Sequence, residues 1–243
     1  RNNDLEGALN RVTAEIRAFP EQGVFFRLRG ELYDFKKLPK KAIADLKKAI
    51  RLDPNDLAAY LDLGNLYGRQ KAFTEALQEL DEAIRVNPKV VQIHMLKGVI
   101  FEAQQQQKQA QLAYEQALEI NPQFAPAANN LAWIYAEYGG NIDKALSLAQ
   151  IAKEQFPDDP SISDTLGWIY YKKSAFLKAV SLLEESVETL SENPLVHYHL
   201  GMAYFKTDKK EQAEKALKRA LKLKPGFLGS EVAKQTLQEI KQE

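Results

Sequence analysis

The sequence predicts an all-α protein made of repeated helical hairpins, and two observations support this prediction. First, small residues and prolines recur every 34 residues in one register, a period typical of proteins that stack one helical unit on the next. The repeating positions are Gly30, Gly64 and Gly98; Ala42, Ala76 and Ala110; Ala49, Ala83 and Ala117; and Pro54, Pro88 and Pro122. Second, apolar residues within each period fall at helical spacing in two blocks, which indicates two amphipathic helices.

The register shifts by one residue in the second half of the chain. Gly167 and Gly201 are also 34 residues apart, but they lie one residue out of phase with the first series. Ala132 still fits the earlier phase, whereas Ala145 fits the later one. We therefore expect the extra residue in the turn at 139–141, whose sequence is Gly-Gly-Asn. The predicted repeats are 23–56, 57–90, 91–124, 125–159, 160–193 and 194–227.

Each repeat is expected to form a hairpin of two helices of about 13–14 residues, without any strand. A small residue in the first helix faces two alanines in the second, so the two axes can approach closely. Proline closes most second helices because it cannot continue a helix. One aromatic residue per repeat is expected to fill the space behind the small residues: Tyr33, Tyr67, Phe101, Tyr135, Tyr170 and Tyr204.

Each end of the chain adds one further helix to the pattern. Segment 4–18 is read as the second helix of a truncated repeat over 1–22. A stack that begins in the middle of a repeat exposes an apolar face, so we expect the chain to be a fragment of a longer protein. Segment 228–242, within 228–243, is read as a capping helix because one of its faces is polar. Its apolar face comprises Val232, Ala233, Leu237 and Ile240.

The register of small residue, aromatic, alanine, alanine and proline resembles the tetratricopeptide repeat (TPR) family over nearly the whole chain. The resemblance implies a single solenoid over 1–243, a right-handed superhelix of antiparallel hairpins whose first helices line the concave surface. Two leucines of the family pattern, beside the glycine, are replaced here by Arg29 and Lys97. The tryptophan that is common early in the family's first helix is replaced by Phe26, Tyr60, His94, Ala128, Ser163 and His197.

Composition narrows the possible partners. The chain has 33 basic and 33 acidic residues, so no net field attracts nucleic acid or an anionic membrane. Lysines gather in repeats one and six, but no set of stacking aromatics is interleaved with them, so we interpret them as solvated helix faces. No apolar run approaches the ~20 residues of a membrane span. We therefore expect no nucleic-acid partner and no transmembrane segment.

No catalytic residue, metal site or cofactor is predicted, and the chain is not expected to be an enzyme. Cysteine is absent, which excludes disulfides and thiolate chemistry. His94 and His197 occupy the packing slot described above, so a structural role is favoured over a ligand role. His197 and His199 are two residues apart and point to different faces, which excludes them as a metal pair. The sequence also has no phosphate-binding loop, no zinc-protease motif and no nucleophile elbow.

The inner face of the solenoid, as the resemblance places it, changes character after residue 124. It is polar in repeats one to three and aromatic in repeats four to six. The expected groove residues are Asn129, Asn130, Trp133, Glu137, Asp164, Thr165, Trp168, Tyr171, Lys172, Tyr198, His199, Met202, Phe205 and Lys206. One interpretation is that these aromatics pack between neighbouring first helices. The other is a ligand platform, since Tyr135 and Tyr170 already fill their hairpins and leave both tryptophans surplus to the core.

The predicted function is a non-catalytic scaffold that binds a partner protein or peptide in the concave groove. The Lys, Asn and Arg clamp with which some TPR proteins hold a C-terminal carboxylate is not found in any three successive repeats. The alternative is a glycan-binding accessory or assembly factor that stacks sugars on Trp133 and Trp168. Repeats four to six, over about 125–227, look like those of bacterial TPR lipoproteins from envelope and exopolysaccharide systems. That resemblance favours a periplasmic or membrane-anchored protein over a cytoplasmic one and leaves the partner's identity open.

Overall fold

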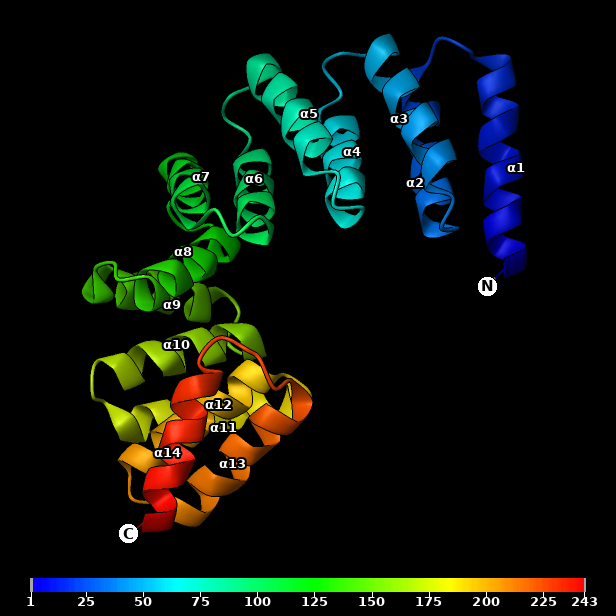
Figure 1. The fold of residues 1–243 in the computed structure, drawn as a ribbon. Coiled ribbons are helices and arrows are strands. Elements are labelled where there is room, and N and C mark those ends of the chain that lie inside the picture. The colour runs from blue at the N-terminus through cyan, green and yellow to red at the C-terminus, as the bar shows by residue number, and fades with distance from the viewer. Residues whose placement is uncertain (1, 243) are drawn as a thin grey trace. The chain divides into compact units, whose positions relative to one another are not determined.

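The computed structural model describes residues 2–242, and within this range it contains fourteen α-helices and no β-strand. Helices α2 to α13 are each 13 or 14 residues long, which confirms the all-α fold class and the expected hairpins (Figure 1). The helices are α1 (Asn2–Ala18), α2 (Gly23–Phe35), α3 (Pro39–Leu52), α4 (Leu57–Arg69), α5 (Phe73–Val86), α6 (Val91–Ala103), α7 (Gln107–Ile120), α8 (Ala125–Glu137), α9 (Ile142–Gln155), α10 (Pro160–Lys172), α11 (Phe176–Thr189), α12 (Pro194–Lys206), α13 (Lys210–Leu223) and α14 (Ser230–Gln242).

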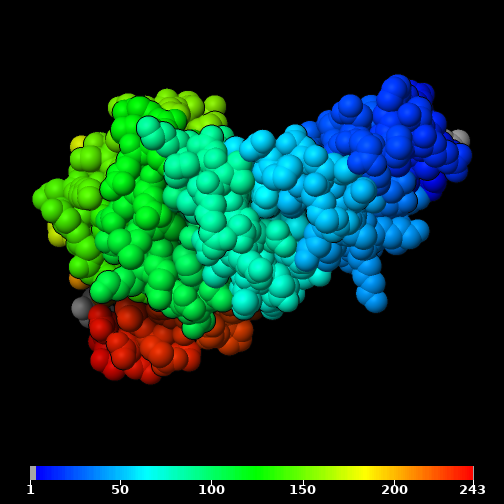
Figure 2. All heavy atoms as spheres, turned by 90° about the horizontal axis from the view of Figure 1, so that it is seen from above, coloured from blue at the N-terminus to red at the C-terminus, as the bar shows by residue number. Residues whose placement is uncertain are grey.

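The chain divides into two compact units, Arg1–Asn121 and Pro122–Glu243, which we describe separately. The first unit contains α1 to α7, and its helices pack on one another in chain order, as the colour gradient in Figure 2 illustrates. The second unit contains α8 to α14. Within each unit the two helices of each repeat pack together, and α2 contacts α4, α4 contacts α6, α8 contacts α10, and α10 contacts α12.

The repeated glycines lie where the two helices of a hairpin touch. A Cβ atom on Gly64 would be 2.9 Å from Leu80 Cδ2, and one on Gly98 would be 2.2 Å from Cε1 of the Tyr114 ring. Any side chain at these positions would push the helices apart, because protein interiors are close-packed. The prediction that these glycines lie at helix contacts is confirmed for all five: Gly30, Gly64, Gly98, Gly167 and Gly201.

The one-residue insertion lies in the turn between α8 and α9, as expected. Residues 138–141 form this turn, whereas three residues, such as 36–38, join the helices of the other hairpins. Gly139 has a φ of 88°, in the left-handed region that glycine tolerates best. The three-residue turns place a non-glycine residue in the same region, with φ near 60°: Lys37, Lys71, Gln105, Ser174 and Asp208.

The expected terminal helices are present and differ from the prediction only in their first residues. Helix α1 begins at Asn2 rather than at residue 4, and it packs on α2. Helix α14 begins at Ser230 rather than at residue 228, since Gly229 has a φ of 94°, which is incompatible with a right-handed helix. Helix α14 packs on both α12 and α13.

Ion pairs compensate the two charged residues that replace leucine in the repeat pattern. Arg29 donates two hydrogen bonds to the Asp45 carboxylate, at 2.6 and 2.8 Å. The side-chain hydrogen bond to Asp45 raises the pKa of Arg29. Lys97 donates to Asp81 at 2.6 Å. Because each cation has an acceptor, the hairpin pattern survives the loss of these two leucines.

Candidate functional site

The expected groove residues of repeats four to six lie on α8, α10 and α12, all within the second unit. The structure brings most of their rings together. The Trp168 ring stacks on Tyr171 with centroids 4.6 Å apart, and on His199 with centroids 4.1 Å apart. The Trp133 ring lies 5.6 Å from that of His199. Three first helices therefore contribute to one continuous aromatic cluster.

Polar groups hold the Trp168 indole in place. Its Nε1 donates a hydrogen bond of 2.8 Å to Glu137 Oε2. Lys172 Nζ lies 4.9 Å from the centre of the Trp168 ring and 3.7 Å from Glu137 Oε2. The buried indole N–H thus has an acceptor. The Lys172 ammonium is attracted both to the Glu137 carboxylate and to the face of the Trp168 ring.

His199 is fully buried beneath the two tryptophans. Its Nδ1 lies 2.8 Å from Asp164 Oδ1. Within the described residues, neither its Nε2 nor the buried Oδ1 of Asn129 has a hydrogen-bond partner. Buried polar atoms are nearly always paired in proteins, and these two atoms are both shielded from solvent.

Helix α14 and the residues just before it cover one side of this cluster. The Tyr198 ring lies 5.4 Å from the Phe227 ring, and Thr236 Oγ1 lies 3.6 Å from Met202 Sδ. Burial, together with nearby negative groups, raises the pKa of Tyr198 to about 12. The capping helix therefore packs on the very face of α12 that was expected to line the groove.

This packing corrects part of the expected site. Trp168 is only 3% exposed and belongs to a hydrophobic cluster with Leu217 and Ala233. The interpretation that both tryptophans are surplus to the core is therefore wrong for Trp168. Five other expected groove residues are also buried: Asp164, Thr165, Tyr198, His199 and Met202. The rest of the set is partly or fully exposed: Asn129, Asn130, Trp133, Glu137, Tyr171, Lys172, Phe205 and Lys206.

The inner-face positions of the first unit are polar and linked by ion pairs. Arg27 bonds to Asp56 at 3.0 Å and also to Glu31, and Asp34 accepts from Arg69. Asp62 lines a recess of about 270 Å³ together with Glu31, Asp34 and Arg69. Burial, reinforced by the nearby Glu31 carboxylate, raises the pKa of Asp62 to about 6, although Arg27 acts in the opposite direction. Asp62 is therefore a partly buried carboxylate whose ionised form is disfavoured.

We predict that Asp62→Asn makes the first unit more stable at neutral pH. The folded state binds a proton at Asp62 more tightly than the unfolded chain does, where an Asp pKa is near 3.9. Ionised Asp62 therefore destabilises the fold above pH 6, and this penalty disappears as the pH falls toward 4. The gain should be on the order of 1 kcal/mol at pH 7.5, since partial exposure screens the effect, and close to zero at pH 4.

Urea unfolding of the wild type and Asp62→Asn at both pH values measures the difference. Glu75→Gln, which neutralises an exposed carboxylate of the same unit, is the control and should show no such pH dependence. An equal effect of Asp62→Asn at pH 7.5 and pH 4 would contradict the prediction.

The two histidines in the tryptophan slot have structural roles. His94 Nε2 lies 2.9 Å from the Pro88 carbonyl oxygen, and His197 Nε2 lies 2.8 Å from that of Ser191. Each ring thus bonds to the backbone six residues earlier, in the turn that follows the preceding helix. The preference for a structural role over a ligand role agrees with these contacts.

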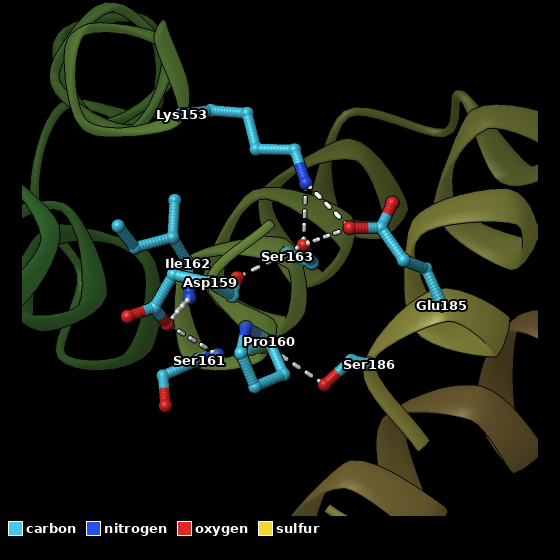
Figure 3. A network of polar contacts seen from close by, with 8 residues as sticks. All are labelled: Lys153, Asp159, Pro160, Ser161, Ile162, Ser163, Glu185 and Ser186. Atoms are coloured by element: carbon cyan, nitrogen blue, oxygen red, sulfur yellow. Dashed lines mark hydrogen bonds and ion pairs between the residues drawn. The ribbon is translucent and has the colours of Figure 1, made fainter. Parts of the chain in front are cut away.

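Ser163, in the same slot of repeat five, lies at the centre of a polar network (Figure 3). Lys153 Nζ donates to Ser163 Oγ and to Glu185 Oε1, both at 2.6 Å. The hydrogen bond from Lys153 lowers the pKa of Glu185. Ser163 Oγ in turn donates to Glu185 Oε1 at 2.8 Å. The network joins α9, α10 and α11.

Two further properties concern the described part of the chain as a whole. No group of three or more His, Asp or Glu side chains within residues 2–242 is arranged to hold a metal ion. Over the same range, none of the helices combines the length and apolar character needed to cross a membrane.

Comparison with known proteins places this arrangement in a family. The tetratricopeptide repeat pattern matches residues 37–100 and 102–169, and a second form of that repeat matches 194–227. No curated protein matches the sequence significantly.

Several solved structures share the fold. A chain of the Cut9–Hcn1 hetero-tetramer of the APC/C aligns with a TM-score of 0.76 and 15% identity, over 99% of this chain and 46% of that one. The present chain thus spans about half of that relative's length. A tetratricopeptide repeat protein from Parabacteroides merdae gives a TM-score of 0.64 and 17% identity, with coverage of 99% and 93%. YrrB, a TPR protein with an unusual peptide-binding site, gives 0.58 and 23%, with coverage of 76% and 95%.

Proposed function

Because this chain belongs to the tetratricopeptide repeat family, we propose that it is a non-catalytic scaffold that binds a peptide segment of a partner protein. The binding surface we propose is the inner face of α8, α10 and α12. The observation that carries this proposal is the position of Trp133. Its indole is partly exposed, although its neighbours His199 and Trp168 are buried.

The surroundings of Trp133 suit a peptide. Asn129 lies one helical turn before Trp133 and Glu137 one turn after it, so all three lie on one face of α8. Asn129 is partly exposed, and a side-chain amide can both donate hydrogen bonds to a peptide backbone and accept them from it. Exposed Lys172, on α10, adds a charged group near Glu137. A rigid aromatic anchor beside polar groups is the usual composition of a binding hot spot.

The same observations favour a peptide over a polysaccharide. A sugar platform built on both indoles needs an accessible face on each of them. The Trp168 ring is instead stacked on Tyr171 and on His199. One indole remains available for stacking. Peptide recognition needs only one such anchor, and a peptide-binding site is known for YrrB, which shares the fold.

Replacement of Trp133 by alanine tests this proposal. Twelve-residue peptides are selected from a displayed random library on the wild-type protein, and their dissociation constants are measured by fluorescence anisotropy. For peptides that bind this face, Trp133→Ala should weaken binding about 30-fold, equivalent to ~2 kcal/mol. The control is Tyr138→Ala, which removes an exposed aromatic of the same repeat from the turn after α8 and should leave affinity unchanged.

Helicity and melting temperature establish that each variant is folded. If every selected peptide binds folded Trp133→Ala as tightly as the wild type, the inner face of α8, α10 and α12 is not the binding surface.

A further inference from the structure

A second surface of the second unit has a different chemistry from the inner face. A groove of about 670 Å³ lies between α11 and α13, with α12 along its floor. We call it the α11–α13 groove. Its floor is apolar and consists of Val187, Leu200, Tyr204 and Ala216. Leu200, Tyr204 and Ala216 belong to the core of the unit yet retain 5%, 8% and 7% exposure. The groove therefore exposes a narrow strip of the core.

Two residues that are smaller than their counterparts in the repeat pattern keep this groove open in repeat six. Ala216 occupies the position that Leu148 and Leu182 hold in repeats four and five, 34 residues apart in each step. His197 occupies the slot where the family pattern has tryptophan, and its Nε2 lies 2.8 Å from the Ser191 carbonyl oxygen in the turn after α11. Both substitutions remove bulk that would otherwise fill the space between the second helices.

The rim of the groove is strongly basic. Its charged residues other than histidine are four cations and the single carboxylate of Glu192. The cations are Lys215, Lys218, Arg219 and Lys222. The corresponding positions of repeat five are uncharged or acidic: Ser181, Glu184, Glu185 and Glu188. The reversal of charge is therefore local to repeat six, in a chain whose net charge is zero.

Two of these cations are free to meet a partner. Arg219 is paired with Glu192 and Lys218 with Glu214. Lys215 and Lys222 are exposed, and among residues 2–242 neither has an ion-pair partner. They are seven residues apart on α13, so they lie two turns apart on the same helix face, roughly 10 Å from each other.

We propose that the α11–α13 groove binds an acidic amphipathic segment of a partner protein, independently of the inner face. The apolar side chains of that segment would lie on the Leu200, Tyr204 and Ala216 floor, and its carboxylates would meet Lys215 and Lys222. Charge complementarity of this kind selects partners and speeds their association. A membrane surface is a poorer occupant, because membrane-binding elements insert an apolar face into the bilayer, whereas the apolar residues here lie in a groove between α11 and α13.

The test uses the full chain and a defined probe. The probe is a fluorescein-labelled helical peptide with leucine and phenylalanine on one face and glutamate on the other. We expect saturable binding that weakens as salt rises, since exposed charges are screened. The Lys215→Glu/Lys222→Glu double variant should weaken binding at least tenfold, and Ala216→Leu should weaken it similarly by filling the groove. The matched control is Lys89→Glu/Lys108→Glu, which makes the same change in charge at exposed positions of the first unit and should bind as the wild type does.

Each outcome decides the question. Equal loss in both charge variants would show nonspecific attraction and overturn the proposal, as would unchanged binding in Ala216→Leu. Binding to phosphatidylserine vesicles that is lost in Lys215→Glu/Lys222→Glu, without any binding of the peptide, would assign the groove to a membrane instead. Trp133→Ala should leave this peptide's affinity unchanged, which separates a failure here from a failure of the inner-face proposal.

Discussion

Replacing Trp168 by alanine is expected to lower the free energy of unfolding of the second unit by about 3–5 kcal/mol, the range for a large aromatic removed from a core. The indole is 3% exposed and lies between the rings of Tyr171 and His199. Its removal also leaves Glu137 without the hydrogen bond from Nε1. Because α14 closes over the same cluster through Tyr198, the cavity cannot be filled by a simple collapse of one side chain. Urea unfolding followed by circular dichroism measures the loss.

Trp133→Ala is the matched control, since the two tryptophans occupy equivalent positions in adjacent repeats. Trp133 is partly exposed, so its removal should cost less than half as much stability. Equal losses for the two variants would mean that the two indoles are equivalent in the folded protein, contrary to the packing described here. Trp168→Phe should recover much of the loss, because it restores a ring between Tyr171 and His199.

Gly167→Leu is expected to have the second largest effect, about 3 kcal/mol or more, at the upper end of what overpacking costs. A Cβ atom at Gly167 already lies 2.8 Å from Leu183 Cγ and 3.4 Å from the Ala179 carbonyl oxygen. The backbone oxygen cannot rotate away as a side chain can, so the remainder of a leucine must push α10 off α11. The same argument predicts a comparable loss for Gly64→Leu, which meets Leu80 in the first unit.

Gly7→Leu is the control for this prediction, because a Cβ atom at Gly7 has no neighbour within 4 Å. Leucine is a better helix former than glycine, so Gly7→Leu should leave stability unchanged or raise it slightly. Guanidinium melts of the variants give the comparison. A loss below about 0.5 kcal/mol for Gly167→Leu, the range of ordinary surface substitutions, would refute the close-contact role of this glycine.

The sequence predicts the hairpins well because each one is specified locally. The small residue, the alanines and the proline all lie within 34 residues of their partners, and they determine where each pair of helices touches. Even the register shift can be located, since Gly139 and Gly140 mark the one turn with room for an extra residue. The repeat pattern does not determine the first residue of a terminal helix, because a single residue in the left-handed region, such as Gly229, shifts the start of the helix.

The candidate site could be predicted only in part, because burial there depends on a helix outside the repeat pattern. The apolar face predicted for the capping helix is correct for Ala233, which is fully buried, but Val232 is 43% exposed. Nothing in the spacing indicates that Phe227 and Thr236 contact α12. Trp133 and Trp168 therefore look alike in sequence although only one of them is available to a partner. The sequence pattern does not reveal the α11–α13 groove, because lysines on a solvated helix face and lysines on the rim of a groove have the same spacing. The one indication in the sequence is Ala216, which replaces the leucine found at this position in repeats four and five.

The distribution of tryptophan has a practical consequence for experiments on this protein. The chain contains two tryptophans, and both belong to the second unit. Intrinsic emission excited at tryptophan wavelengths therefore reports on that unit alone, whereas far-ultraviolet ellipticity reports on the helices of both. Stacked Trp168 and the partly exposed Trp133 also give the emission two components, one shielded from soluble quenchers and one accessible to them. Without any label, the two optical signals distinguish a chain that melts as one cooperative body from one whose halves melt in turn.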